Sequence, residues 1–478
     1  MSSISGVIKA IRKHMREDRG VNGDAQRIEQ LGWMLFLKIF DDKEQELELS
    51  DAYQSPIPDQ LKWRNWAAND EGMTGDTLLA FVNEELLPGL AGLTPSPTDG
   101  RRAVIRNIFQ DNNNYMKSGT IMKMVVNEIN KIDFNRNKDK QVFGRIYEDM
   151  LKELQSAGKA GEFYTPRGVT EFMVDVLQPQ LTESVLDPAC GTGGFLTAAA
   201  ERMREQSTNV EDLRLLQQNL RGIEVKPLPY QLCVTNLILH DIAQPNITYD
   251  STLAQELTNI RNRDRVDVVL ANPPFGGVVA HGEEKNVPSK FRSRETADLF
   301  LLYIMRYLKN DGGRAAIVLP DGSLTGDGVK QKLREKWLTD CNLHTIVRLP
   351  NSVFKPYAQV STNLLFFTKG ERTEGIWYYE HQLPEGQKSY SKTKPIRRAE
   401  FDPALEWWDE RVETEQAWYV PIADIQKRGY DLDIKNPNAP EADHGDPEKL
   451  LAAYHVQAEE LRQLQAELLK ELSAALTD

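Results

Sequence analysis

The 478-residue chain is poor in cysteine and histidine and has no long apolar run. Its three cysteines are far apart, and the seven histidines do not cluster with them. Disulfide frameworks and zinc sites need paired or regularly spaced cysteines, so we expect neither, and we assign no metal site. No run approaches the roughly 18 apolar residues of a membrane-spanning helix, and the first residues lack the pattern of a signal peptide. We therefore expect a cytoplasmic protein.

Positive charge is also scarce. The chain has 58 Lys and Arg against 71 Asp and Glu, which gives a net charge of −13. Proteins that bind DNA tightly and nonspecifically usually carry a basic domain, because Lys and Arg displace counterions from the phosphates. If this chain acts on DNA, its basic residues are concentrated in one cleft or a partner supplies much of the affinity.

Between about residues 160 and 370, short β-rich runs alternate with longer helical patterns. The β-rich runs lie at 184–187, 221–224, 266–270, 315–319 and 345–349. This alternation predicts an α/β fold with an open, largely parallel sheet wrapped by helices. Ligands of such sheets bind outside the carboxyl ends of the strands.

The flanking segments differ from this central α/β domain, which we place at 156–372. Residues 1–155 carry apolar residues at helical spacing and predict a helical N-terminal domain. Its tryptophans Trp33, Trp63 and Trp66 could offer a stacking platform for bases, but tryptophans in helical segments favour a place in the core. Residues 373–440 predict an irregular extension rich in aromatic side chains.

Residues 441–478 form a fourth segment, which predicts one amphipathic helix from about residue 446. A 4-3-4-3-4 spacing typical of a coiled-coil seam connects Leu450, Tyr454, Gln457, Leu461, Leu464 and Leu468. Nine acidic residues face three Lys and Arg in this segment, so it does not favour phosphate. The apolar seam either folds back on its own domain or contacts a partner helix.

A glycine-rich turn follows the first β-rich run. The run ends in Asp187, and the turn contains Thr192, Gly193 and Gly194 before a helical pattern begins. Glycines let the backbone pass close to a ligand, and a helix start offers free N–H donors. The Gly-x-Gly-x-x-Gly spacing that cradles a pyrophosphate is absent. The turn suits a ligand with a charged amino-acid end and no phosphate.

A second acidic residue, Glu224, ends the next β-rich run. A carboxylate at the end of the second strand can accept both ribose hydroxyls of an adenosine. Taken alone, the glycine-rich segment could be an ordinary tight turn, and Glu224 could be an ordinary surface acid. Their order favours a nucleoside-containing cofactor.

The tetrapeptide Asn272-Pro273-Pro274-Phe275 directly follows the run 266–270. Two prolines stiffen the strand exit and restrict the residue before each. Asn272 could then accept a hydrogen bond from an amino group, Pro273 could add its backbone carbonyl, and Phe275 could stack on a flat ring. Adenine's amino nitrogen is a poor nucleophile, and two acceptors on its hydrogens would favour a pyramidal, reactive geometry. The base must first leave the helix stack.

The order of three motifs resembles the amino-methyltransferases whose cofactor motif precedes the catalytic one: residues 162–167, 187–195 and 272–275. With the helical N-terminus and the segment 362–367, the chain more narrowly resembles the modification (methylation) subunit of type I restriction-modification systems. The resemblance implies a Rossmann-like core that uses S-adenosyl-L-methionine. It also implies methyl transfer to the N6 amino group of a flipped adenine.

The same resemblance implies roles for individual residues. Asn272, Pro273, Pro274 and Phe275 would receive the target base. Contacts with S-adenosyl-L-methionine would come from Glu162, Phe163, Tyr164, Thr165, Pro166, Arg167, Asp187, Thr192, Gly193, Gly194, Glu224 and Asp250. We assign no catalytic role to Cys190.

The implied partners are double-stranded DNA, a specificity subunit that chooses the site, and a second copy of the methylation subunit. A restriction subunit can join them and add cleavage. The acidic balance fits a subunit that borrows DNA affinity, and the segment 441–478 is the candidate contact with the specificity subunit.

Three other functions stay open at this point. A solitary adenine methyltransferase would need its own target-recognition domain, and residues 371–440 are short for one. A protein-glutamine methyltransferase would share the core without needing the long helical N-terminus. An inactive assembly protein would have no chemical reason to retain both motifs.

Two further segments carry open hypotheses. The loop 276–297 contains Lys285, Lys290, Arg292 and Arg294, and it either contacts DNA phosphate or is a solvated surface loop. Phe354, after the run 345–349, could add a second aromatic wall against the target base.

Overall fold

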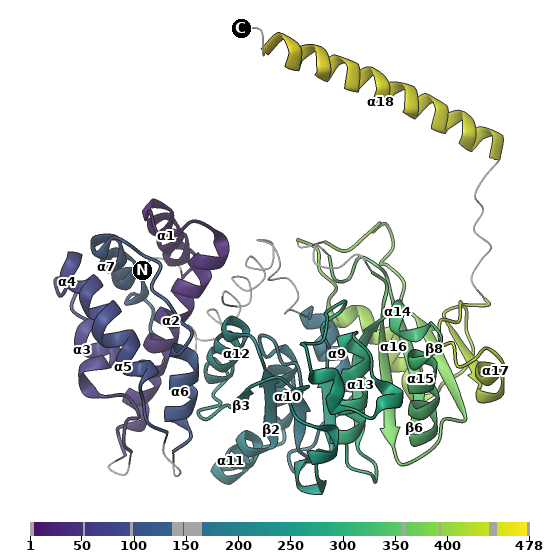
Figure 1. Cartoon of the computed structure of the whole chain (residues 1–478), viewed down its shortest axis with the longest axis horizontal. Coiled ribbons are helices and arrows are strands. Elements are labelled where there is room, and N and C mark those ends of the chain that lie inside the picture. Colours follow the sequence, from purple (N-terminus) through teal and green to yellow (C-terminus); the bar gives the residue numbers. More distant parts are fainter. Residues whose placement is uncertain are drawn as a thin grey trace. The chain divides into compact units, whose positions relative to one another are not determined.

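A computed structural model describes the residues 4–50, 53–95, 99–135, 147, 165–355, 360–391, 393–438 and 447–475 (Figure 1). The chain divides into two units, Met1–Asn436 and Pro437–Asp478. No helix among these described residues is long and apolar enough to cross a membrane.

Nine strands of the described chain form one sheet in the order β3-β2-β1-β4-β5-β7-β6-β8-β9. The strands are β1 (Val185–Asp187), β2 (Leu220–Glu224), β3 (Asn246–Tyr249), β4 (Val268–Ala271), β5 (Arg314–Pro320), β6 (Cys341–Leu349), β7 (Thr362–Lys369), β8 (Gly375–Glu380) and β9 (Ala417–Pro421). The five strands from β3 to β5 run parallel, whereas β7 runs antiparallel to both of its neighbours. The predicted α/β fold is confirmed, and every predicted β-rich run coincides with a strand.

The expectation of an irregular segment at 373–440 needs correction. This stretch contains β8 and β9, and β8 pairs in parallel with β6 inside the main sheet. Its aromatic residues make cross-strand contacts: the rings of Tyr378 and Trp418 are stacked, with centroids 5.3 Å apart. The strands are short and lack a clean polar-apolar alternation, so the sequence pattern alone did not reveal them.

Helices cover both faces of the sheet because successive strand residues point to opposite sides. On β4, Val268 and Leu270 join one hydrophobic core, and Val269 and Ala271 join the other. The first core includes residues of α9 (Arg167–Leu177), α10 (Gly194–Arg204), α11 (Val210–Asn219), α12 (Pro227–Leu239) and α16 (Asp402–Asp409). The second includes residues of α13 (Thr296–Tyr307), α14 (Asp321–Leu324), α15 (Val329–Asp340) and α17 (Ile422–Lys427).

The N-terminal region is helical, as predicted, and packs on the β3 side of the sheet through α12 (Figure 1). Its helices are α1 (Ile4–Glu17), α2 (Asp24–Leu47), α3 (Trp63–Trp66), α4 (Gly75–Ala80), α5 (Leu87–Ala91), α6 (Arg101–Phe109) and α7 (Gly119–Ile129). Trp33, Trp63 and Trp66 are buried, which confirms that they belong to the core. Asn112 Nδ2 donates a hydrogen bond to Gln231 Oε1 of α12 at 2.8 Å and ties this region to the sheet domain.

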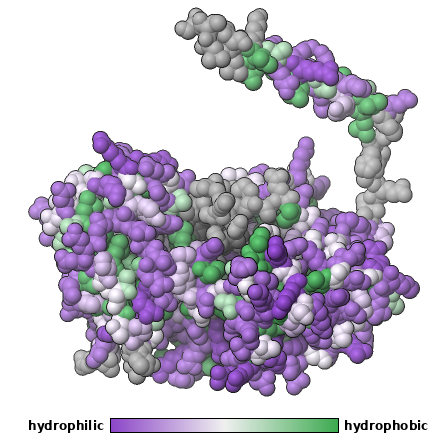
Figure 2. Space-filling model, in the orientation of Figure 1, coloured by the Kyte–Doolittle hydropathy of each residue, from purple (hydrophilic) through white to green (hydrophobic). Residues whose placement is uncertain are grey.

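The second unit contains one long helix, α18 (Pro447–Ala475), where the sequence predicts a helix. Apolar side chains lie along its surface (Figure 2). Within the unit, Leu461, Leu464 and Leu468 are each more than half exposed.

Candidate active site

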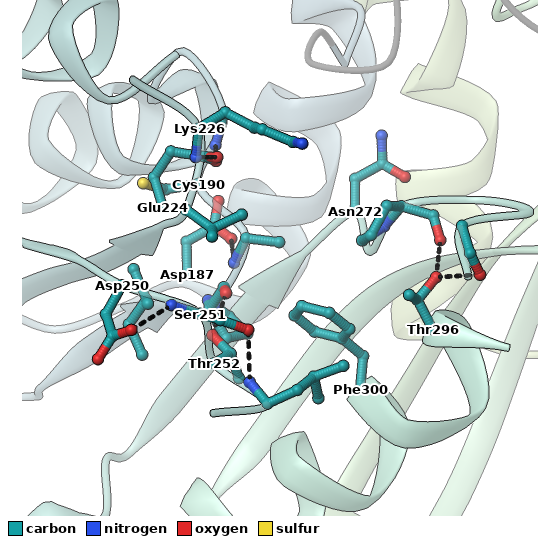
Figure 3. Close-up of a pocket in the computed structure, with 18 of the residues that line it drawn as sticks. Asp187, Cys190, Glu224, Lys226, Asp250, Ser251, Thr252, Asn272, Thr296 and Phe300 are labelled. Atoms are coloured by element: carbon teal, nitrogen blue, oxygen red, sulfur yellow. Dashed lines mark hydrogen bonds between the residues drawn. The ribbon is translucent and has the colours of Figure 1, made fainter. Parts of the chain in front are cut away.

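The candidate site lies at the carboxyl edge of the parallel strands. Strand order reverses between β1 and β4, because the chain continues from β1 to β2 and β3 on one side and from β4 to β5 on the other. This switch point is where open α/β sheets bind ligands. A cavity of about 350 Å³ opens there (Figure 3). Its wall includes eight of the predicted residues: Thr165, Asp187, Thr192, Gly194, Glu224, Asp250, Asn272 and Pro274.

Figure 3 shows two groups of side chains across this cavity. Asp187, Glu224 and Asp250 follow β1, β2 and β3 on one side. Asn272 and Thr296 lie on the other side. The sheet therefore brings together the acidic residues and the Asn-Pro-Pro-Phe motif, although Asp187 and Asn272 are 85 residues apart in the sequence.

The glycine-rich turn after β1 forms one wall. Gly191 and Gly193 have φ angles of 52° and 83°, in the left-handed region that glycine adopts without steric cost. A Cβ on Gly193 would lie 2.9 Å from Cys233 Sγ, so this position also needs glycine for space. The turn leads into the first residues of α10, whose N–H groups have no partner within the helix.

Glu224 is held by backbone donors. Its Oε2 accepts a hydrogen bond from Gly191 N at 2.9 Å, and its Oε1 accepts one from Lys226 N at 2.8 Å. Burial raises the pKa of the Glu224 carboxyl, and these N–H donors act against that rise. Each carboxylate oxygen can accept more than one hydrogen bond, so Glu224 retains capacity for hydroxyl groups in the cavity.

Asp187 is almost fully buried. Its Oδ1 accepts a hydrogen bond from Ala189 N at 3.0 Å, and no cation in the described ranges forms an ion pair with it. Burial raises the pKa of Asp187 to about 8, and the nearby Glu224 adds to the rise. The cavity wall thus contains a carboxyl group whose ionised form lacks a counter-charge.

Asn272 presents an unused acceptor. Its Nδ2 donates a hydrogen bond to Thr165 Oγ1 at 3.0 Å, whereas its Oδ1 is buried and has no donor among the residues that the structure describes. A buried acceptor without a partner costs about 1–3 kcal/mol. A ligand amino group that donated to Oδ1 would recover this cost, so the residues fit an adenine amino group.

Several predicted residues do not line the cavity. Arg167 pairs with Glu171 and Glu201 on the helices α9 and α10, which directs its charge away from a ligand. Phe275 contacts Phe354 edge to face, with ring centroids 6.2 Å apart. The two aromatic side chains that were expected to stack on the target base are therefore neighbours. Their stacking on a base stays a prediction. Also absent from the lining are Pro166, Gly193 and Pro273, while Glu162, Phe163 and Tyr164 fall outside the described residues.

Other lining residues were missed by sequence reasoning. Lys226, Ser251 and Thr252 follow β2 and β3 directly, so their places at strand ends are a signal that could have found them. Thr296 and Phe300 lie on α13, whose helical pattern resembles that of any buried helix. Only the tertiary structure brings these two to the site.

The loop after the Asn-Pro-Pro-Phe motif borders the same cavity, because residues 277–280 belong to its wall. Buried Val287 and Phe291 anchor the loop. Its exposed cations are Lys285, Lys290, Arg292 and Arg294. No carboxylate in the part of the chain that the structure describes forms an ion pair with any of the four, although 27% of the chain is charged.

Comparison with known proteins identifies the family. The profile of the N-6 DNA methylases matches residues 138–446. The chain belongs to the N-6 DNA methylase family. A second profile, the HsdM N-terminal domain, matches residues 4–129. This membership makes the chain a DNA methyltransferase.

Similar proteins assign this N-6 DNA methylase to the type I methylase subunits. It is 51% identical to the methylase subunit of the type I restriction enzyme EcoEI from Escherichia coli, over 99% of this chain and 98% of that relative. A modification subunit of a type I restriction enzyme from Vibrio vulnificus YJ016 matches with a TM-score of 0.83 and 42% identity, over 92% of this chain and 98% of that one. A chain from a structural study of type I restriction-modification complex assembly matches with a TM-score of 0.82 and 36% identity, over 99% and 98%.

Proposed function

We propose that this methylase subunit transfers a methyl group from S-adenosyl-L-methionine to the N6 amino group of an adenine flipped out of double-stranded DNA. A specificity subunit chooses the site. The observation that carries the proposal is the unpartnered Oδ1 of Asn272, which lies in the same cavity wall as the buried carboxyl groups of Asp187 and Glu224.

The carboxyl side of the cavity has the chemistry to hold the cofactor. When bound, S-adenosyl-L-methionine supplies a methyl group on a cationic sulfonium. Glu224 has spare acceptor capacity for two ribose hydroxyls, and Asp187 offers negative charge to a cationic ligand. The first turn of α10, which begins at Gly194, contributes N–H donors that have no partner within the helix. Asp250, beside Ser251, would contact the adenine ring of the cofactor.

The Asn272 side has the chemistry to receive the base. Asn272 Oδ1 would accept one N6 hydrogen, and the Pro273 carbonyl would accept the other. With both hydrogens held, the nitrogen lone pair leaves conjugation with the ring and becomes nucleophilic. Positioning and electrostatics then carry the catalysis, and no strong general base is required. Phe275, which Phe354 supports from the side, would stack on the flipped ring.

Dependence on a specificity subunit has two supports. The net charge is −13, so affinity for DNA must come from a local surface and from partners. The stretch 373–440, where a solitary enzyme would carry a target-recognition domain, contributes β8 and β9 to the catalytic sheet. We infer that α18, with its exposed apolar seam, contacts the specificity subunit, and that a second methylase copy completes the complex. A restriction subunit can join it.

Mapping of methylated adenines tests the proposal. Genomic DNA from cells that express the wild-type complex should carry N6-methyladenine at one recurring sequence, and DNA from cells that lack this gene should not. Asn272→Ala should abolish the modification, because the first acceptor is removed, while the purified variant still binds S-adenosyl-L-methionine. Methylation by the Asn272→Ala variant at wild-type level would overturn the assignment of Asn272, and site-specific methylation by this chain alone would overturn the dependence on a specificity subunit.

A further inference from the structure

We infer that Thr296, on α13, is a positioning residue that fixes the Pro273 carbonyl as the second acceptor for the N6 hydrogens. This inference rests on the proposed function. It concerns a residue that carries no recognisable motif and that lies opposite the acidic side of the cavity (Figure 3).

Thr296 holds the strand exit through hydrogen bonds to two backbone carbonyls. Its Oγ1 lies 2.8 Å from the Pro274 carbonyl oxygen and 3.3 Å from that of Gly277, and its backbone N–H donates to the Gly277 carbonyl at 3.2 Å. Thr296 is only 9% exposed. Thr296 therefore connects the first turn of α13 to the loop that carries the catalytic motif.

The proline ring transmits this restraint to the preceding peptide. The ring of Pro274 fixes its φ angle, so only rotation about ψ of Pro274 separates the plane of the Pro273–Pro274 peptide bond from the direction of the Pro274 carbonyl. Thr296 sets that direction. Among the described residues no donor bonds to the Pro273 carbonyl, which stays available as an acceptor. Without the Thr296 hydroxyl, Pro274 could rotate about ψ and change the direction of the Pro273 carbonyl.

Gly277 supplies a second, independent observation. A Cβ at this position would lie 2.9 Å from Thr296 Oγ1 and 3.2 Å from its Cγ2. Gly277 does not have a left-handed φ angle, so glycine is not required there for backbone conformation. The need for glycine comes from the close approach of the Thr296 side chain.

The main experiment compares Thr296→Val with Thr296→Ser in the assembled complex. Valine keeps the side-chain shape and the backbone N–H bond, and it removes the hydroxyl contacts with the Pro274 and Gly277 carbonyls; serine restores both contacts. We expect the single-turnover rate of methyl transfer, with cofactor and DNA saturating, to fall about tenfold to a hundredfold in the valine variant and to recover with serine. Cofactor affinity and Tm should stay near the wild-type values.

A matched control separates positioning from simple loss of a buried hydrogen bond. Thr235 is also buried, and its Oγ1 donates to the Gln231 carbonyl at 2.8 Å, but it does not line the cavity. Thr235→Val should therefore leave the transfer rate unchanged. Gly277→Ala, which would push the Thr296 side chain away, should slow transfer as Thr296→Val does, and the double variant should lose little more than either single one.

The outcomes distinguish this inference from the proposed function. If the wild-type complex does not methylate adenine, the proposed function fails. If it does, and Thr296→Val slows transfer no more than Thr235→Val does, then Thr296 only caps α13 and the inference is wrong. The inference would also be wrong if the valine variant had a lower cofactor affinity or a lower Tm but reached the wild-type rate of methyl transfer at saturating cofactor and DNA.

Discussion

At the scale of single residues, the active site is marked by polar groups that the folded chain leaves unsatisfied. Asp187 is buried without a cationic partner, and Asn272 Oδ1 is buried without a donor in the described chain. Each is unfavourable for folding by itself. Both face one cavity, so a cation and an amino group can satisfy them when the ligands bind.

Binding of S-adenosyl-L-methionine should depend on pH through Asp187. The pKa of Asp187 is about 8, so most of the free protein holds the proton at neutral pH. A cationic ligand favours the carboxylate and lowers this pKa, so binding releases a proton. Affinity should therefore rise with pH between about 6 and 7.5, by at most about tenfold per unit.

Calorimetry in buffers of different ionisation enthalpy measures the proton release directly. Asp187→Asn keeps the oxygen that accepts from Ala189 N and cannot ionise, so its cofactor affinity should be lower and independent of pH. A wild-type affinity that does not change over this pH range would contradict the pairing of Asp187 with the cationic ligand.

At the scale of elements, the loop between β4 and α13 is the candidate surface for contact with DNA. Its wall residues 277–280 are followed by the exposed cations Lys290, Arg292 and Arg294, which have no acidic partner among the described residues. Because these cations are exposed and follow directly on the cavity wall, we expect this loop to displace counterions from phosphate.

Replacing Lys290, Arg292 and Arg294 with glutamine should weaken DNA binding by the complex and make it less dependent on salt. Each ion pair with a phosphate contributes about 0.9 to the slope of log K against log salt, so removing these cations should reduce the slope by about 2 to 3. Binding titrations at several salt concentrations measure this slope. Cofactor affinity should not change.

Two exposed arginines at the opposite edge of the sheet provide the control. Arg263 lies shortly before the beginning of β4. Arg372 follows the end of β7, which is antiparallel and therefore ends beside the beginning of β5. Arg263→Gln with Arg372→Gln should leave the slope unchanged. An equal reduction of the slope in both sets would mean that the loop is an ordinary solvated surface.

At the scale of the whole molecule, we propose that α18 serves assembly and that the rest of the chain is the catalytic unit. Neither hydrophobic core contains a described residue of the unit Pro437–Asp478. A helix with an exposed apolar seam is stable when another helix covers that seam.

Removal of residues 437–478 should therefore abolish assembly without affecting the catalytic unit. We expect the truncated chain to bind S-adenosyl-L-methionine with an unchanged Tm and to lose co-purification with the specificity subunit. Within the full chain, replacing Leu461, Leu464 and Leu468 with serine should have the same effect. Serine at Glu460 and Arg462, outside the seam, should not; a truncated chain that still assembles would contradict this role of α18.

Much of this protein could be predicted from sequence, because its signals are local. A β-rich run followed by Asp187 and a glycine turn, or by Asn272 and two prolines, predicts a strand end whatever surrounds it. Parallel α/β sheets gather strand ends at one edge, so these residues were expected to meet. The core tryptophans followed from helical spacing in the same way.

Other features depended on contacts between distant segments. Strands β8 and β9 exist because β6 offers a pairing edge, and no local pattern announces that edge. Arg167 matched the motif in sequence, yet Glu171 on its own helix and Glu201 on α10 pair with its charge.

The sequence by itself therefore determined the chemistry that we propose: a turn for the cofactor, an acid for its ribose and an amide acceptor on a rigid strand exit, since each prediction depends on residue type and local backbone. The tertiary structure decided the pKa values, the hydrogen-bond partners and the ion pairing of the groups around the cavity. Burial raises the pKa of Asp187, α13 brings Thr296 to the Pro274 carbonyl, and the loop cations lie without acidic partners beside the cavity. These properties arise from desolvation and from contacts between residues distant in sequence, which no local pattern encodes.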